Sequence, residues 1–117
     1  MANFELDVTG DGDAVVRMSG EIDLAVVDEL LSSAREGLAH HDGLRLDLSR
    51  VTFIDSTGLG ALVRLRNEAS AQGRSLTLVD VPTSLVRLLD ITGLHDMFTV
   101  VDGADEDDAG DEANERP

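Results

Sequence analysis

The residues of this chain that are best placed to do chemistry are two neighbouring hydroxyls behind a carboxylate, in Asp55-Ser56-Thr57-Gly58. An apolar run ends at Ile54, and apolar residues at helical spacing follow Gly58, so the sequence predicts a strand, a tight turn and a helix start. A helix start offers unpaired N–H groups and the positive end of the helix dipole. Ser56 is therefore expected to cap the helix, to accept a phosphate, or to do both.

A second polar turn lies in the stretch from 20 to 25, where Asp23 is a candidate N-cap of an earlier helix. Sites in parallel sheets gather beyond the carboxyl ends of the strands. If the strands before Asp23 and Asp55 are neighbours, Asp23 and Ser56 share one surface.

Catalysis by Ser56 is not expected, because a serine nucleophile needs a base within hydrogen-bond reach. The expected topology does not bring any histidine to it; the three are His40, His41 and His95. The pattern Gly-x-Ser-x-Gly is also missing, since Ile54 occupies the first glycine position. Asp23 and Asp55 could act as an acid–base pair, but nothing indicates a deep pocket, and the chain has only three aromatic residues, all Phe. We expect a protein that is not an enzyme.

No cofactor or metal is expected either. Gly58-Leu59-Gly60 is too short for a dinucleotide loop, because Val63 stands where the third glycine belongs. The Asp11-Gly12-Asp13 run lacks the other ligands of a calcium loop and is interpreted as a turn. The chain has no cysteine, and nothing near the His40-His41 pair completes a zinc site.

Charge narrows the class of partner. The chain of 117 residues has a net charge of −15. Residues 102–117 carry eight acids and one arginine, whereas residues 1–101 carry sixteen acids and eight arginines. This charge argues against nucleic acid and anionic membranes and favours a basic protein partner. No apolar run approaches the ~18 residues of a membrane helix, so the expected location is the cytoplasm.

The periodicities predict one α/β domain over residues 1–101 and a disordered acidic tail over 102–117. Strands are expected at 4–8, 14–19, 44–54, 75–79 and 97–101, with helices after Asp23, after Asp55 and from Pro82. The first two strands should form an antiparallel hairpin and the others should be parallel. The result is a mixed sheet of four to five strands with helices mainly on one face, and Phe53 is expected in its core.

Two stretches together, Gly20-Glu21-Ile22-Asp23-Leu24-Ala25 and the run from Val51 to Leu62, resemble the STAS domain of bacterial anti-sigma factor antagonists. The resemblance covers about residues 4–101. It implies a STAS-like fold and a partner-switching role. The unmodified antagonist binds an anti-sigma factor with serine kinase activity and so frees a sigma factor. The kinase phosphorylates the antagonist and releases itself, and a PPM-type phosphatase reverses the modification.

The resemblance also implies site residues. The phosphoacceptor falls on Ser56, with Thr57 as the second choice, and the remaining expected partner-binding residues are Ile22, Asp23, Leu24, Asp55, Gly58 and Leu59. The family often has a further C-terminal helix, which the acidic tail replaces here. The alternative is an accessory STAS subunit of a lipid or anion transport system. A free-standing chain with an Asp-Ser pair favours the regulatory function over the transport function. The protein is expected to be a monomer or a weak dimer.

Overall fold

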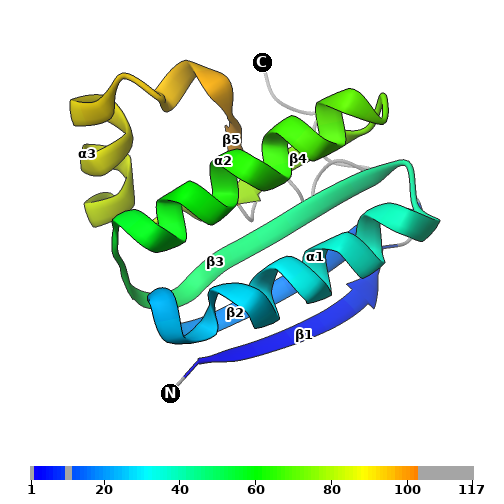
Figure 1. Cartoon of the computed structure of the whole chain (residues 1–117), viewed down its shortest axis with the longest axis horizontal. Coiled ribbons are helices and arrows are strands. Elements are labelled where there is room, and N and C mark those ends of the chain that lie inside the picture. The colour runs from blue at the N-terminus through cyan, green and yellow to red at the C-terminus, as the bar shows by residue number, and fades with distance from the viewer. Residues whose placement is uncertain (1, 10–11, 103–117) are drawn as a thin grey trace, which may run out of the picture.

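The computed structural model describes residues 2–9 and 12–102, and these form a five-stranded sheet with helices (Figure 1). The strands are β1 (Asn3–Val8), β2 (Ala14–Ile22), β3 (Gly43–Ile54), β4 (Ser75–Val79) and β5 (Thr99–Val101). The α-helices are α1 (Val27–His40), α2 (Ser56–Ala71) and α3 (Thr83–Thr92). Two single 3₁₀ turns, η1 (Leu24–Val26) and η2 (His95–Met97), complete the described elements.

The sheet has the strand order β1-β2-β3-β4-β5. β1 pairs with β2 antiparallel, as the short link between them predicts, and the other three pairings are parallel. Each parallel pair is joined by a crossover that contains one of the α-helices. The predicted mixed α/β fold is thus confirmed.

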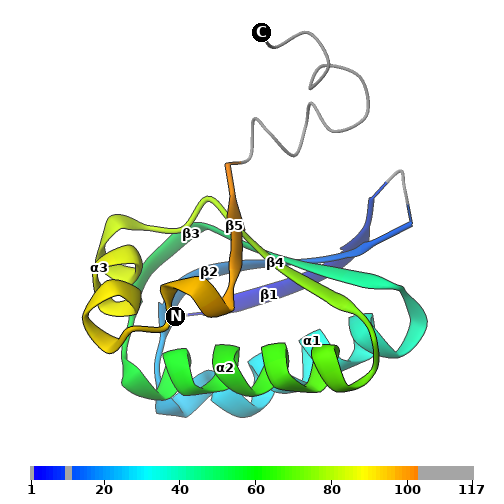
Figure 2. The same cartoon turned by 90° about the horizontal axis from the view of Figure 1, so that it is seen from above.

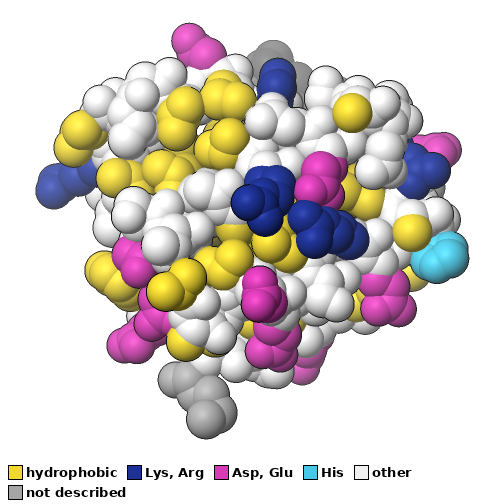
Figure 3. Space-filling model, viewed as in Figure 1, with side chains coloured by type: hydrophobic (Ala, Val, Ile, Leu, Met, Phe, Trp, Pro, Cys, Tyr) yellow, Lys and Arg dark blue, Asp and Glu magenta, His cyan; other side chains and the backbone are white. Residues whose placement is uncertain are grey.

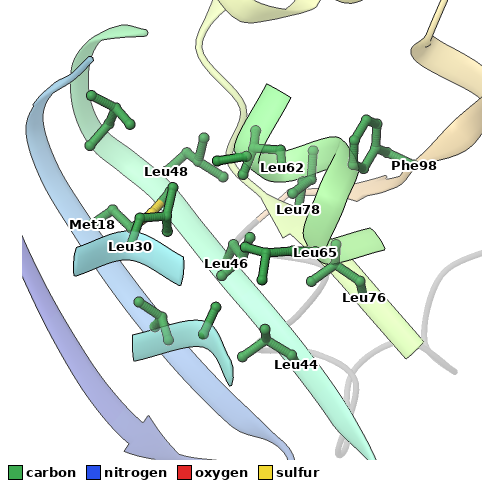
Figure 4. Close-up of a cluster of buried hydrophobic side chains, with 14 of the residues drawn as sticks. Met18, Leu30, Leu44, Leu46, Leu48, Leu62, Leu65, Leu76, Leu78 and Phe98 are labelled. Carbon is green, nitrogen blue, oxygen red and sulfur yellow. The ribbon is translucent and has the colours of Figure 1, made fainter. Parts of the chain in front are cut away.

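The core lies between the sheet and the helices α1 and α2, which cover one face side by side (Figure 2). Leucines from every second position of β3, namely Leu44, Leu46 and Leu48, point into this layer together with Leu62 and Leu65 of α2 (Figure 4). This alternation is the two-residue period of a strand with one buried face. α3 lies at the end of the molecule, beside the start of α2.

One core prediction is wrong, because Phe53 is 51% exposed. The pairing of β2 with β3 shifts register twice: Arg17 faces Asp47 but Ser19 faces Arg50, and two residues later Glu21 faces Phe53. Each shift inserts one extra residue into β3. An extra residue in a strand reverses the alternation beyond it. The first shift turns Val51 inward, and the second reverses the alternation again, so that Ile54 is buried and its neighbour Phe53 is turned outward.

Several element boundaries also differ from the predictions. The last strand begins at Thr99 and not at residue 97, because the chain first makes the η2 turn over His95–Met97. Pro82 is the residue before α3 and not its first residue. β2 runs through Gly20 to Ile22, three residues beyond its predicted end. The predicted acidic tail lies outside the described residues from position 103 on.

Candidate functional site

The ends of β2 and β3 bring the two polar turns of the sequence together. Ile22 pairs with Ile54 as the last residues of these parallel strands. The backbone N–H of Asp55 then donates to the carbonyl oxygen of Ile22 over 3.2 Å, which fastens one turn to the other. Asp23 and Ser56 therefore begin neighbouring turns at one edge of the sheet, as the sequence predicted.

Asp55 is the residue that caps α2. Its Oδ1 accepts from the N–H groups of Thr57 and Gly58, at 3.0 Å each, and its backbone is extended as an N-cap requires. The same carboxylate oxygen accepts the Thr57 hydroxyl. This hydroxyl and the Gly58 N–H hold the pKa of Asp55 below the ordinary aspartate range, so the side chain is ionised at neutral pH.

The expectation that Ser56 caps the helix is therefore wrong, because Asp55 already takes two of the free N–H groups. Ser56 is the first residue of α2, and its side chain is exposed. Its hydroxyl makes no hydrogen bond to any residue in the two described ranges, 2–9 and 12–102. The two hydroxyls of this turn thus differ: the one on Thr57 is bound to Asp55, and the one on Ser56 faces solvent.

The neighbouring turn is organised in the same way on a smaller scale. Asp23 Oδ1 accepts from the Ala25 N–H over 3.0 Å, so the predicted role of Asp23 as an N-cap is confirmed, although for the η1 turn that precedes α1. Leu24 follows, with its side chain 74% exposed. We call the exposed and half-buried residues of the two turns, Asp23, Leu24, Asp55, Ser56 and Thr57, the Ser56 surface.

Three further residues expected at this site lie beneath the Ser56 surface. The side chains of Ile22 and Leu59 are buried, and Gly58 is buried as well. A methyl group added at Gly58 would lie 2.6 Å from Ile54 Cγ1 and 3.0 Å from the Ile22 carbonyl oxygen. In this structure these residues hold the first turn of α2 against the end of β2 and support the exposed residues from below.

Apolar side chains gather at the same end of the molecule, over α3 and the start of α2 (Figure 3). Two large exposed side chains come from elements that reach this end, and neither was predicted to be exposed. These are Phe53, which follows the register shift in β3, and Ile91 of α3, which is 82% exposed. Phe53 was expected in the core, whereas Ile91 lies off the helical spacing of the buried Leu85 and Leu89. The Ser56 surface thus adjoins exposed apolar side chains, as protein-binding surfaces often do.

Within the described ranges, no group of three or more His, Asp or Glu side chains could hold a metal ion. None of the helices that the structure describes is long and apolar enough to cross a membrane.

Comparison with known proteins identifies the family. The model of the STAS domain family matches residues 5–106. The anti-sigma-B factor antagonist of Bacillus subtilis is 36% identical over 103 residues, which cover 84% of this chain and 91% of that protein. The anti-sigma factor antagonist from Mycobacterium paratuberculosis superimposes with a TM-score of 0.77 at 26% identity, covering 86% of each chain.

The same fold occurs in the anti-sigma factor antagonist SpoIIAA in its unphosphorylated form. That structure matches with a TM-score of 0.75 at 20% identity and covers 98% of this chain and 99% of the other. Since the family model spans most of the chain and a relative exceeds 30% identity over nearly its whole length, the chain belongs to the STAS domain family.

Proposed function

We propose that this protein is an anti-sigma factor antagonist whose binding to an anti-sigma factor is controlled by phosphorylation of Ser56. The unmodified protein binds the anti-sigma factor, a serine kinase, through the Ser56 surface and so frees a sigma factor for transcription in the cytoplasm. Phosphorylation by that kinase releases the complex, and a PPM-type phosphatase restores the binding form. The protein itself performs no catalysis. Relatives named anti-sigma-B factor antagonists support this assignment.

The observation that carries the proposal is the difference between the two hydroxyls. Ser56 is exposed and its hydroxyl has no partner among the described residues, whereas the Thr57 hydroxyl donates to Asp55. A kinase must take the serine or threonine hydroxyl into its own active site, and only the Ser56 hydroxyl is available without breaking the cap of α2. This favours Ser56 over Thr57 as the acceptor.

The charges of the turn explain how one phosphate could act as a switch. The phosphate adds about −1.5 to −2 charges at neutral pH. It would stand next to the ionised Asp55, which already occupies the N–H groups of Thr57 and Gly58 that could otherwise neutralise it. The added charge therefore stays on the surface, where it disfavours contact with a part of the partner that presents acids or is uncharged, while the fold persists.

Binding of the kinase to Ser56 variants, measured by calorimetry, tests the proposal. We expect Ser56→Asp to bind at least about tenfold more weakly, because juxtaposed like charges cost several kcal/mol at an interface. Ser56→Ala should bind like the unaltered protein. Ser32→Asp is the matched control, since Ser32 is an exposed serine on α1. If Ser56→Asp binds the kinase as tightly as the unaltered protein does, the proposal is wrong.

Mass spectrometry after incubation with kinase and ATP tests the acceptor itself. We expect one phosphate on the unaltered protein and on Thr57→Ala, and none on Ser56→Ala. Phosphate on another residue of Ser56→Ala would reassign the switch. A transport accessory subunit, the alternative function, should show no ATP-dependent modification at all.

A further inference from the structure

A groove at the opposite end of α2 has the chemistry of an anion site. It has a volume of about 220 Å³ and lies between the C-terminal half of α2, the start of β4 and the η2–β5 segment. Its lining consists of Arg66, Ser70, Arg74, Ser75, Leu76, Met97 and Thr99. The lining thus offers two guanidinium groups and three hydroxyls and contains no acid, although residues 1–101 carry twice as many acids as arginines.

Neither arginine of the groove has a charged partner among residues 2–9 and 12–102. The Arg66 Nε donates to the Met97 carbonyl oxygen over 3.2 Å, and its Nη1 donates to the Asn67 side chain, so both of its acceptors are neutral. The Arg74 side chain makes no hydrogen bond or ion pair with any residue in the described part of the chain. Both residues are half-buried.

The other half-buried arginine in the described ranges has a partner, since Arg45 forms an ion pair with Asp13 over 3.4 Å. Half-buried cations are favoured when an anion neutralises them, because burial removes part of their hydration. The groove therefore offers two cations that an anionic ligand could neutralise.

We propose that this groove binds the acidic C-terminal segment of the same chain. Residues 105–108 are four consecutive acids, Asp105-Glu106-Asp107-Asp108. In the sequence, the segment follows β5, which ends at Val101, and Thr99 of this strand lines the groove. The groove lies about 7 Å back along β5, at about 3.3 Å per residue. Four extended residues span about 13 Å, so the acids from position 105 on can return to it.

A second groove also contains two arginines, but its charges suit the acidic segment less well. It has a volume of about 350 Å³ and lies on the sheet face that α1 and α2 leave open. Its two arginines stand among the acids Glu5 and Asp47, and Arg17 already pairs with Asp7 over 3.1 Å. An acidic segment would meet repulsion there as well as attraction. The groove of Arg66 and Arg74 is the one whose charges complement residues 105–108.

Tethering makes weak contacts sufficient. Exposed and half-exposed carboxylate–arginine contacts are individually weak, but a short tether raises the effective concentration of the segment to the millimolar range. Screening by salt should release it, because the contacts are ionic and close to solvent. Binding in this groove holds the acids at the end of α2 that is remote from Ser56. The proposal does not depend on the function proposed above.

A nitroxide label on the full-length chain tests this placement. The chain has no cysteine, so Ala113→Cys gives a single labelling site without changing the charge. We expect the label to weaken the amide signals of Ser70, Arg74 and Ser75 more than those of other described residues at low salt. The effect should be lost at high salt. A strongest effect elsewhere, such as on Arg17 and Arg50, would overturn the proposal.

Matched variants connect the effect to the two arginines. We expect Arg66→Gln/Arg74→Gln to abolish the signal loss and Arg66→Lys/Arg74→Lys to retain most of it, because lysine keeps the charge. Arg64→Gln/Arg87→Gln is the control, since it removes two exposed charges from α2 and α3. Should the glutamine variant not fold, the lysine variant and the salt series still test whether the acidic segment binds in the groove. A mixture of nitroxide-labelled chains and isotope-labelled chains without nitroxide tests for binding between molecules. If all of the signal loss also appears in this mixture, binding within one chain is contradicted.

Discussion

Thr57 separates the two hydroxyls of the Ser56 surface, because its own side chain is committed to Asp55. The Thr57 hydroxyl and N–H both donate to Asp55 Oδ1, and the Gly58 N–H makes a third contact. One carboxylate oxygen thus organises the whole turn. The consequence for function is that the turn keeps its shape without any contribution from the Ser56 hydroxyl, which is left free to be modified.

The first prediction concerns the pKa of Asp55. In Thr57→Ala the pKa should rise toward the ordinary aspartate range, because the Thr57 hydroxyl is the largest cause of its lowering. The carboxyl carbon shift of Asp55, followed by NMR as a function of pH, measures this directly. The pKa of Asp7, which the Val8 N–H and Arg17 lower at a distance from this turn, should not change. An unchanged Asp55 pKa would show that the hydroxyl does not stabilise the carboxylate.

The sign of the pH dependence follows from the same contact. Since the pKa of Asp55 is lowered on folding, the cap stabilises the protein fully at pH values above the unfolded pKa, which is about 3.9. The stabilisation is lost as the pH falls through the lower, folded value. Thr57→Ala should therefore be less stable than the unaltered protein at neutral pH, and the difference should shrink in acid.

The second prediction compares two glycines of α2 that are two residues apart. Gly58→Ala should destabilise the protein by about 1–3 kcal/mol, because the new methyl group has no room between Ile54 and the Ile22 carbonyl. Gly60 has no heavy atom within 4 Å of such a methyl, so Gly60→Ala should stabilise the helix by about 0.5–1 kcal/mol. Urea unfolding of the two variants measures both effects. Equal effects of the same sign would disprove the close contact at Gly58.

At the scale of elements, α1 and α2 are joined across the surface by one two-pronged ion pair. Arg35 Nε and Nη2 donate to the two carboxylate oxygens of Glu68, over 2.9 and 2.7 Å. The contact holds the pKa of Glu68 below the ordinary glutamate range. Arg64 adds a weaker attraction from within α2. The pair fixes the relative position of the two helices that begin at the Ser56 surface.

The third prediction measures this ion pair. Glu68→Gln should lower the free energy of unfolding by about 0.2–1 kcal/mol at neutral pH, since exposed ion pairs are weak. The loss should vanish as the pH falls through the lowered pKa of Glu68, because the unaltered protein then also loses the charge. Glu36→Gln, an exposed acid of α1, is the control. A Glu68→Gln variant that loses no more stability than this control would show that the pair contributes nothing.

The register in which β3 pairs with β2 could not be predicted from the sequence. Alternation placed Leu44, Leu46 and Leu48 in the core, and turn chemistry placed Asp23 and Asp55 at helix starts. The alternation could not show the two extra residues in β3, because a bulge depends on how the partner strand pairs. Phe53 was expected in the core because it belongs to the apolar run that ends at Ile54, and it is exposed.

The sequence predicted where the candidate site lies, but not which of its residues caps α2. The two turns were found because carboxylates before apolar helical stripes are local signals. The choice between Asp55 and Ser56 as the cap was not predictable, because both residue types cap helices equally well. It depends on which side chain reaches the N–H groups of Thr57 and Gly58, and this requires the backbone of the turn.

At the scale of the whole molecule, acidity opposes folding. Sixteen acids and eight arginines share residues 1–101, and a compact state brings like charges closer than an unfolded chain does. Only three ion pairs between arginine and an acid are found in the described ranges: Arg17–Asp7, Arg35–Glu68 and Arg45–Asp13. Because acids outnumber arginines two to one over residues 1–101, we expect long-range repulsion to outweigh local attraction at neutral pH.

The fourth prediction follows from this balance. Raising NaCl from low concentration to about 0.15 M shortens the screening length to about 8 Å, which weakens the distant repulsions more than the contact ion pairs. The free energy of unfolding at pH 7 should therefore rise with salt. Urea unfolding over a salt series measures the rise, and sodium perchlorate at equal ionic strength should give the same rise if screening is its cause. Stability that falls with added salt would show that the ion pairs, and not the repulsion, dominate the electrostatics of this fold.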